Sequence, residues 1–356
     1  MKKALLSALI FFACMLSACG GEHSVSGRIV EADTDPGVGL VSFVVRTDRD
    51  KEVGILLTDE THIFTFVDGL DADTFREGAQ TDVAVTVTYD PSRRSLITED
   101  GEKLTAYNAT HIEVESCRLP DTTRLSDGTE LEVWQSSRYL TYFLPDGTEL
   151  LRVNTPVGPS ADYMVGQESL DSLPDQARNK ILAWYDDRGL LYDEQAELEK
   201  TYAYYLAAGN TPFEAPMLAQ EVTPSAASDR VFYLLTSVSF PAGSSLMYEQ
   251  RTGAAFDKAT GDFIPAADLF TCPWEDVLPR LLDLAQITDP DLRQEMSQAF
   301  TPECLIFFPE YVMLCFPQGR LPSQEYTFLV TVNYADGASA LLQDWAVPAA
   351  PAEGPA

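Results

Sequence analysis

Strand-like and helix-like runs occur in separate blocks along this 356-residue chain. Alternating apolar and polar residues, the pattern of half-buried strands, fill residues 25–116 and return in several runs after residue 130. Helical patterns group at residues 172–209 and 274–300. Because strands and helices do not alternate strictly, the sequence predicts an α+β fold.

The length favours two domains over one. Residues 25–116 are predicted to form the first, a small OB-like β-barrel, because five strands with one helix after the third are typical of that fold. The helical piece is DADTFREG, residues 71–78. Turn residues in RLPDTTRLSDG, after Cys117, mark the predicted boundary. The five extended runs are Val25–Glu31, Leu40–Arg46, Val53–Leu57, Asp82–Tyr89 and Lys103–Val114.

Residues 122–348 are predicted to form a second, α+β domain of antiparallel strands with packed helices. Ser172 can cap its first helix and Asp193 its second, since Ser and Asp are favoured N-cap residues. The first helix places Trp184 on its apolar face, which predicts core packing. The segment TPSAASD, residues 223–229, is predicted to be a linker, and residues 230–256 a β-hairpin. The tail, residues 349–356, is predicted to be disordered.

The N-terminus, MKKALLSALIFFACMLSACGG, is typical of an export signal. Its apolar run of about 13 residues is shorter than the roughly 20 that a spanning helix needs. The motif Leu16-Ser17-Ala18-Cys19 resembles a bacterial lipobox, which implies cleavage after residue 18 and acylation of Cys19. The alternative is an ordinary secretory signal. We therefore expect a signal peptide at 1–18, a tether at 19–24 and a protein anchored by lipid to the extracytoplasmic face of the cell membrane.

The composition is strongly acidic, with 55 Asp and Glu residues against 24 Lys and Arg residues. Such a surface repels nucleic-acid phosphates and anionic head groups, so nucleic acid is not an expected partner. Cationic proteins would be attracted, although acidity can also serve solubility alone.

Four cysteines remain after the signal and Cys19 are set aside, namely Cys117, Cys272, Cys304 and Cys315. An even number in an exported chain permits disulfides. A two-residue turn at Pro309-Glu310 would place Cys304 opposite Cys315, in a hydrogen-bonded pair that is the less suitable geometry for a bridge. The four can equally be free buried thiols.

The stretch AAFDKATGDFIPAADLF, residues 254–270, combines a strand end, a Thr-Gly turn and a short run before a helix. Asp257 is predicted to form the turn, Gly261 to take a left-handed conformation in it, and Asp268 to cap a helix. The stretch is therefore expected to have a structural role and not a catalytic one. Its motif residues are Phe256, Asp257, Thr260, Gly261, Asp268, Leu269 and Phe270.

With the later run CLIFFPEYVMLCFPQGRLPSQEYTFLVTVNY, this stretch resembles the C-terminal domain of unknown function (DUF3298 type) of RsiV-like lysozyme-sensing anti-sigma factors. The resemblance covers residues 223–348, with a weaker DUF4163-like part at 122–222 and none before Cys117. The family's transmembrane helix and sigma-binding segment have no counterpart in this sequence, and neither has the catalytic domain of the deacetylases that also carry this module. The resemblance therefore implies an extracellular, wall-facing recognition module of the Gram-positive type.

No catalytic or metal motif is evident. The histidines are His23, His62 and His111, and no pair has the spacing of a metal site such as HExxH. The chain lacks a CxxC, a GxSxG elbow and a Gly-rich phosphate loop. We expect no enzyme and no cofactor. The expected function is binding of a cationic wall-active protein such as lysozyme, or of peptidoglycan glycan. The alternatives are a peptidoglycan hydrolase that uses paired carboxylates and a passive structural lipoprotein.

Overall fold

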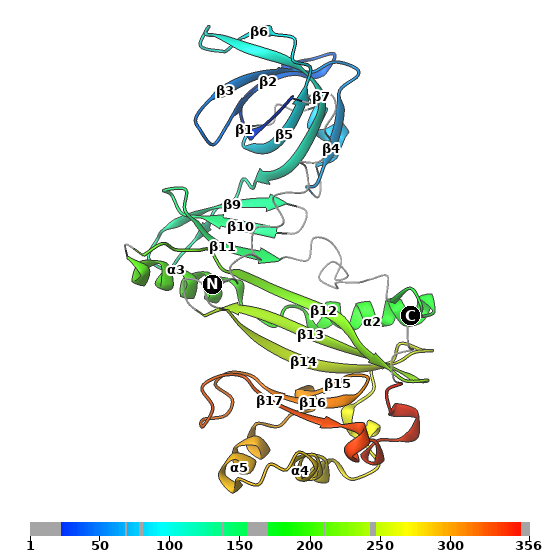
Figure 1. Cartoon of the computed structure of the whole chain (residues 1–356). Coiled ribbons are helices and arrows are strands. Elements are labelled where there is room, and N and C mark those ends of the chain that lie inside the picture. The colour runs from blue at the N-terminus through cyan, green and yellow to red at the C-terminus, as the bar shows by residue number, and fades with distance from the viewer. Residues whose placement is uncertain are drawn as a thin grey trace, which may run out of the picture. The chain divides into compact units, whose positions relative to one another are not determined.

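The computed structural model describes residues 23–67, 70–77, 81–136, 139–154, 170–209, 211–242 and 247–349. The chain divides into two compact units, Met1–Arg118 and Leu119–Ala356 (Figure 1). The predicted signal peptide, the lipid-bearing Cys19 and the tail after residue 349 lie outside the described residues.

Unit 1 is built on strands that pair in a ring. β7 pairs with β3, β3 with β2, β2 with β1, β1 with β5, and β5 with β7 again. The inward side chains form one core, in which Ile29, Ile55, Val87 and Ile112 are fully buried. The elements are β1 (His23–Asp35), β2 (Gly39–Arg46), β3 (Glu52–Leu56), β4 (His62–Thr65), α1 (Ala72–Glu77), β5 (Val83–Tyr89), β6 (Arg94–Ile97) and β7 (Lys103–Arg118).

Two of these strands, β4 and β6, were not expected from the sequence. Each has four residues, none of which is buried, so neither shows the apolar pattern of a core strand in the sequence. β4 pairs parallel with β7, and β6 pairs antiparallel with it. As a result α1 follows the fourth strand of the chain, not the third as expected for the OB-like arrangement. The OB-like barrel stays a prediction.

Unit 2 begins with a meander and a helical crossover. β11 pairs parallel with β12, and the connection between them contains α2 and α3, as parallel neighbours require. The bounds are β8 (Thr123–Arg124), β9 (Glu130–Ser136), β10 (Tyr139–Phe143), β11 (Glu149–Asn154), α2 (Asp175–Arg188), α3 (Glu194–Ala208) and β12 (Met217–Ala227).

Two local expectations in this region were wrong. The predicted linker at 223–229 is mostly strand β12, which pairs with β13 from Ala219 to Ala227 in spite of Pro224 and a register shift next to it. Long-range pairing here overrides turn-forming residue types. Ser172 does not cap α2, whose N-cap position is taken by Pro174. Asp193 does cap α3, since its side chain accepts a hydrogen bond from the amide of Ala196.

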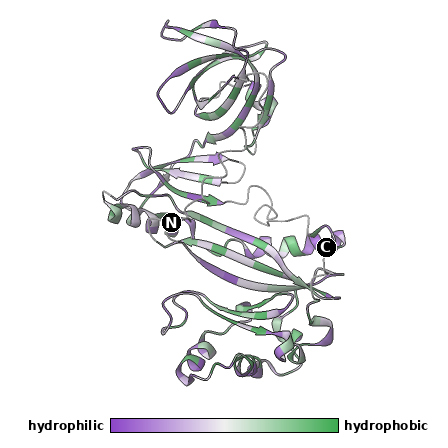
Figure 2. Ribbon diagram, viewed as in Figure 1, coloured by the Kyte–Doolittle hydropathy of each residue, from purple (hydrophilic) through white to green (hydrophobic). Residues whose placement is uncertain are grey.

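The long hairpin of β13 (Val231–Pro241) and β14 (Met247–Asp257) lies at the centre of unit 2. Phe232 and Leu234 of β13 pack against α2, whereas Val231 and Tyr233, which point to the opposite face, pack against the C-terminal segments. Both faces of the hairpin are therefore covered, and β13 is buried along most of its length. Figure 2 shows hydrophobic residues recurring along these strands.

The C-terminal segments form a second, three-stranded antiparallel sheet with two helices (Figure 1). Its strands are β15 (Leu305–Phe307), β16 (Tyr311–Phe316) and β17 (Phe328–Asn333), and its helices are α4 (Trp274–Leu284) and α5 (Pro290–Ala299). Short 3-10 turns join them: η3 (Ala266–Leu269), η4 (Pro302–Cys304), η5 (Tyr334–Asp336), η6 (Ala338–Leu341) and η7 (Asp344–Ala346).

The predicted α+β class is confirmed. The described sheet pairings are antiparallel except β3–β7, β4–β7 and β11–β12. Within the described ranges, no helix has the length and apolarity needed to cross a bilayer.

Candidate recognition site

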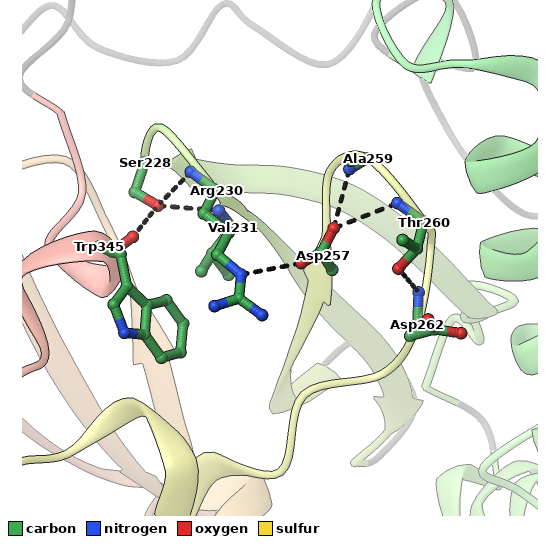
Figure 3. A network of polar contacts seen from close by, with 8 residues as sticks. All are labelled: Ser228, Arg230, Val231, Asp257, Ala259, Thr260, Asp262 and Trp345. Atoms are coloured by element: carbon green, nitrogen blue, oxygen red, sulfur yellow. Dashed lines mark hydrogen bonds and ion pairs between the residues drawn. The ribbon is translucent and has the colours of Figure 1, made fainter.

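Asp257 organises the turn that follows β14 (Figure 3). One carboxylate oxygen accepts hydrogen bonds from the amides of Ala259 (3.0 Å) and Thr260 (3.1 Å), and the other accepts one from Nε of Arg230 at 2.9 Å. Hydrogen bonding from Arg230, then from the two amides, holds the pKa of this carboxyl below its usual range. Asp257 is therefore an ionised turn former, as expected, and is not poised to exchange protons.

Arg230 extends this network to the C-terminal end of the unit. Its guanidinium carbon lies 4.6 Å from the ring centroid of Trp345. The hydroxyl of Ser228 donates to the carbonyl of Trp345 at 2.7 Å and accepts from the amide of Val231 at 2.9 Å (Figure 3). These contacts join the β12–β13 connection, the start of β13, the turn after β14 and η7. The network therefore has a structural role, since it stabilises the conformation of the turn.

Gly261 allows the turn to lie directly against α2. Its φ is +74°, and a Cβ added there would lie 2.3 Å from the carbonyl oxygen of Ala177. Only glycine fits both the backbone conformation and this close approach. The adjacent Asp262 pairs with Lys180 of α2 at 2.7 Å.

The other motif residues are mostly structural. Phe256, Leu269 and Phe270 are buried in the hydrophobic clusters, and Thr260 accepts a hydrogen bond from the amide of Asp262. The prediction that Asp268 caps a helix was wrong. Asp268 lies within the turn η3, and the N-cap position of α4 is Pro273. Between η3 and α4 the backbone is extended at Phe270, which forms a β-bridge to Leu342. Helix α4 begins only at Trp274.

A small hollow opens where α2, β14 and η4 meet beside this turn. Phe263 lines it with 44 % of its surface exposed. Its ring stacks on Trp184, with 5.2 Å between centroids and 12° between planes, and Trp184 in turn packs edge-on against the buried Phe256. The partly exposed ring of Phe263 is thus held in one orientation by its packing on Trp184.

Arg188 and Glu303 supply the polar part of the hollow. The guanidinium carbon of Arg188 lies 5.1 Å from the ring centroid of Trp184, and its Nη2 donates to Glu303 at 2.8 Å. The hollow encloses about 40 Å³, more than one water needs. Its apolar lining comes from Ala254, Ala255, Ile264, Leu269, Leu305 and Phe307. A flat apolar ring beside one cation and one anion is suited to ligands that have both an apolar face and polar groups, as sugars do.

Sequence reasoning did not single out this hollow. Trp184 was expected in the core, and it is indeed only partly exposed, whereas Phe263, Arg188 and Glu303 carried no recognisable motif. The only local signal was Phe263, an aromatic residue directly after a turn. Glu303 lies more than a hundred residues from Arg188, so their pairing depends on the fold.

Cys304 and Cys315 are buried, free thiols in the structure. The β15–β16 register begins at Leu305–Leu314, so Cys304, which lies in η4, is just outside the paired residues. Burial raises the pKa of the Cys315 thiol to about 11. Cys117 and Cys272 are also free and are half-buried.

Comparison with known proteins finds only distant similarities. No protein-family model and no curated protein matches the chain. Solved structures that align with it include two DUF3298 family proteins. The one from Pseudomonas aeruginosa PAO1 has 12 % identity over 41 % of this chain and 71 % of its own, with a TM-score of 0.26. The one from Bacteroides fragilis has 12 % identity over 64 % and 92 %, with a TM-score of 0.31. Identities and TM-scores this low do not assign a family or a function.

Proposed function

We propose that this chain is a non-enzymatic cell-surface lipoprotein, anchored by lipid on Cys19, whose second unit is a wall-facing recognition module. In this proposal residues 223–348 are a DUF3298-type domain, residues 122–222 a DUF4163-like part, and unit 1 an OB-like domain. The lipobox and the motif residues of the turn support the assignment.

The preferred ligand is a cell-wall glycan bound at the hollow beside Phe263. The supporting observation is the exposed ring of Phe263, held parallel on Trp184. The apolar face of a pyranose can stack on such a ring without further ordering of the side chain, so little entropy is lost on binding. Arg188 and Glu303 can hydrogen-bond to sugar hydroxyls, and the apolar floor can receive a small group such as the methyl of an acetamide.

Recognition is favoured over hydrolysis at this site. Glu303, which is ion-paired with Arg188, is the one carboxylate among the described residues that line the hollow, whereas a glycosidase uses a pair of carboxylates. A glycosidase acid needs a raised pKa. In the described residues, every carboxyl group with a shifted pKa has it lowered, namely Asp71, Asp90, Asp127, Asp146, Glu249, Asp257 and Asp262.

A cationic wall-active protein such as lysozyme is the second candidate ligand. Unit 2 has 35 Asp and Glu residues against 13 Lys and Arg residues, so most of the negative charge of the chain belongs to it. Such an excess of negative charge raises the rate of association with a cationic partner. The affinity would then depend mainly on a smaller, well-packed contact area.

The glycan proposal is tested by co-sedimentation of the mature protein with insoluble peptidoglycan and by calorimetric titration with a soluble N-acetylhexosamine oligosaccharide. Phe263→Ser should weaken binding by about 2- to 10-fold, the range that corresponds to an aromatic contact of about 0.5–1.5 kcal/mol. Tyr326→Ser is the matched control, because Tyr326 is 69 % exposed and does not line the hollow. Equal affinity of both variants and the wild type would refute the site.

Lysozyme binding is tested in parallel on immobilised mature protein at low and high salt. Charge-driven association should slow as salt shortens the Debye length to about 8 Å at physiological strength. Absence of binding at low salt would exclude this ligand. Release of reducing ends from peptidoglycan by the wild-type protein would instead support the hydrolase alternative.

A further inference from the structure

Two of the three histidines of the chain face each other on the outer surface of unit 1. The parallel pairing of β4 with β7 sets His62 directly opposite His111, although they are 49 positions apart. Both are exposed, whereas Ile112 beside His111 is fully buried, so the two imidazoles lie on the outward face of the sheet. Their ring centroids are 5.3 Å apart, and their planes are inclined by 35°.

We propose that His62 and His111 form a binding site for a divalent transition-metal ion, with Cu²⁺ bound most tightly and Zn²⁺ less so. With metal–nitrogen bonds of about 2.0–2.1 Å and a tetrahedral angle, the centroids of two coordinated imidazoles lie about 5 Å apart. The observed separation matches this value without movement of the strands. Imidazole nitrogens suit Cu²⁺ and Zn²⁺ and are poor ligands for Ca²⁺ or Mg²⁺, and the stability order of the first-row ions places Cu²⁺ first.

Neighbouring side chains hold one ligand and provide a favourable potential. The ring of Phe64 lies parallel to that of His111, with 6.1 Å between centroids and 5° between planes. Glu113 and Glu115 follow on the same face of β7, and Glu115 is fixed by a hydrogen bond of 2.6 Å from the hydroxyl of Thr86. Nearby carboxylates attract a cation, and the ring of Phe64 lies against one of the two ligands.

The site supplies two protein ligands, and water completes the coordination shell. Among the described residues, no cluster of three or more His, Cys, Asp or Glu side chains could hold a metal ion. An open coordination shell predicts an exchangeable ion with free positions, unlike the closed set of four ligands in a structural zinc site. A third ligand from a bound partner could occupy one of those positions.

The test is a calorimetric titration of the mature protein, prepared without a polyhistidine tag, with CuCl₂ and with ZnCl₂. The wild type should bind one equivalent of Cu²⁺, and its affinity for Cu²⁺ should be higher than its affinity for Zn²⁺. His62→Gln and His111→Gln should each weaken Cu²⁺ binding by about 10- to 100-fold or more, since even loss of an outer-shell partner costs this much. The double variant should be little weaker than either single variant, because one imidazole alone is a poor site.

His23→Gln is the matched control, because it removes the third histidine, whose ring stacks on Tyr89 and not on either member of the pair. Its affinity should equal that of the wild type. Electron paramagnetic resonance of the Cu²⁺ complex gives a second readout, in which nitrogen hyperfine splitting should be lost in the double variant. Unchanged affinity and unchanged nitrogen splitting in the double variant would overturn the proposal, and would indicate that other nitrogen donors, such as backbone amides, bind the ion.

Discussion

Gly261 is predicted to be the residue on which the recognition hollow depends most, although it does not line it. Replacing it with alanine puts a side chain on a residue whose φ is +74° and brings the new Cβ to 2.3 Å from the carbonyl oxygen of Ala177. The left-handed conformation costs a non-glycine residue about 1–2 kcal/mol. Relieving the clash with backbone atoms of α2 costs about 1–3 kcal/mol more.

Together these contributions lower the free energy of unfolding of unit 2 by about 2–5 kcal/mol. For a unit of this size about 1 kcal/mol corresponds to about 2–4 °C, so a loss of 3 kcal/mol lowers the midpoint by about 6–12 °C. Helix α2 carries Trp184 and Arg188, so its displacement should also weaken glycan binding at the hollow.

The assay is urea and thermal unfolding of the mature protein followed by tryptophan fluorescence. All four tryptophans lie in unit 2, so the signal reports that unit alone. Gly319→Ala is the matched control, since Gly319 has a φ of +79° but no neighbouring atom within 4 Å of the position that a Cβ would take. It should show only the conformational cost of about 1–2 kcal/mol. Equal destabilisation by the two substitutions would refute the argument that close packing of the turn on α2 requires glycine.

Three further outcomes are expected. Asp257→Asn should destabilise unit 2 by about 1–3 kcal/mol at pH 7. Hydrogen bonding from Arg230 lowers the folded-state pKa of Asp257, so its contribution is full above the unfolded pKa of about 3.9 and is lost as pH falls through the lower folded value. The stabilities of the wild type and the variant, measured by urea titration, should therefore converge as pH falls below about 3.9. Phe256→Ala should cost unit 2 about 3–5 kcal/mol in the same assay, since it empties a fully buried site beneath Trp184. In a variant that keeps Cys315 as its only cysteine, the thiol should react with Ellman's reagent at least about 100-fold more slowly in the native protein than in urea. The reason is that burial excludes the reagent and raises the thiol pKa from 9.0 to about 11. Comparable rates would show that Cys315 is accessible.

Local patterns in the sequence were sufficient for the fold class and for several elements of unit 2. The hairpin at 230–256 was predicted within about one residue, because each strand has a run of β-branched and aromatic residues bounded by turn formers. The cap at Asp193 and the turn at Asp257 follow from short-range hydrogen bonding between a side chain and nearby amides. Such features depend on a few consecutive residues and can be read without knowing the partners.

The elements that sequence reasoning missed depend on partners far along the chain. β12 contains Pro224 and small polar residues, and it is a strand because β11 and β13 pair with its two edges. β4 has four residues and exists through its pairing with β7. The short-range signals at these positions are weaker than the hydrogen bonds and burial that the rest of the fold supplies.

The sequence by itself determined the α+β class, the strongly acidic composition, the predicted export signal with its lipobox, and the turn chemistry around Gly261. Only the tertiary structure decided which side chains meet. His62 meets His111 through parallel strand pairing, and Phe263 meets Trp184 because glycine lets the turn approach α2. The physical reason is that a side chain's own neighbours set its backbone conformation, whereas a binding site requires groups that only long-range packing brings together.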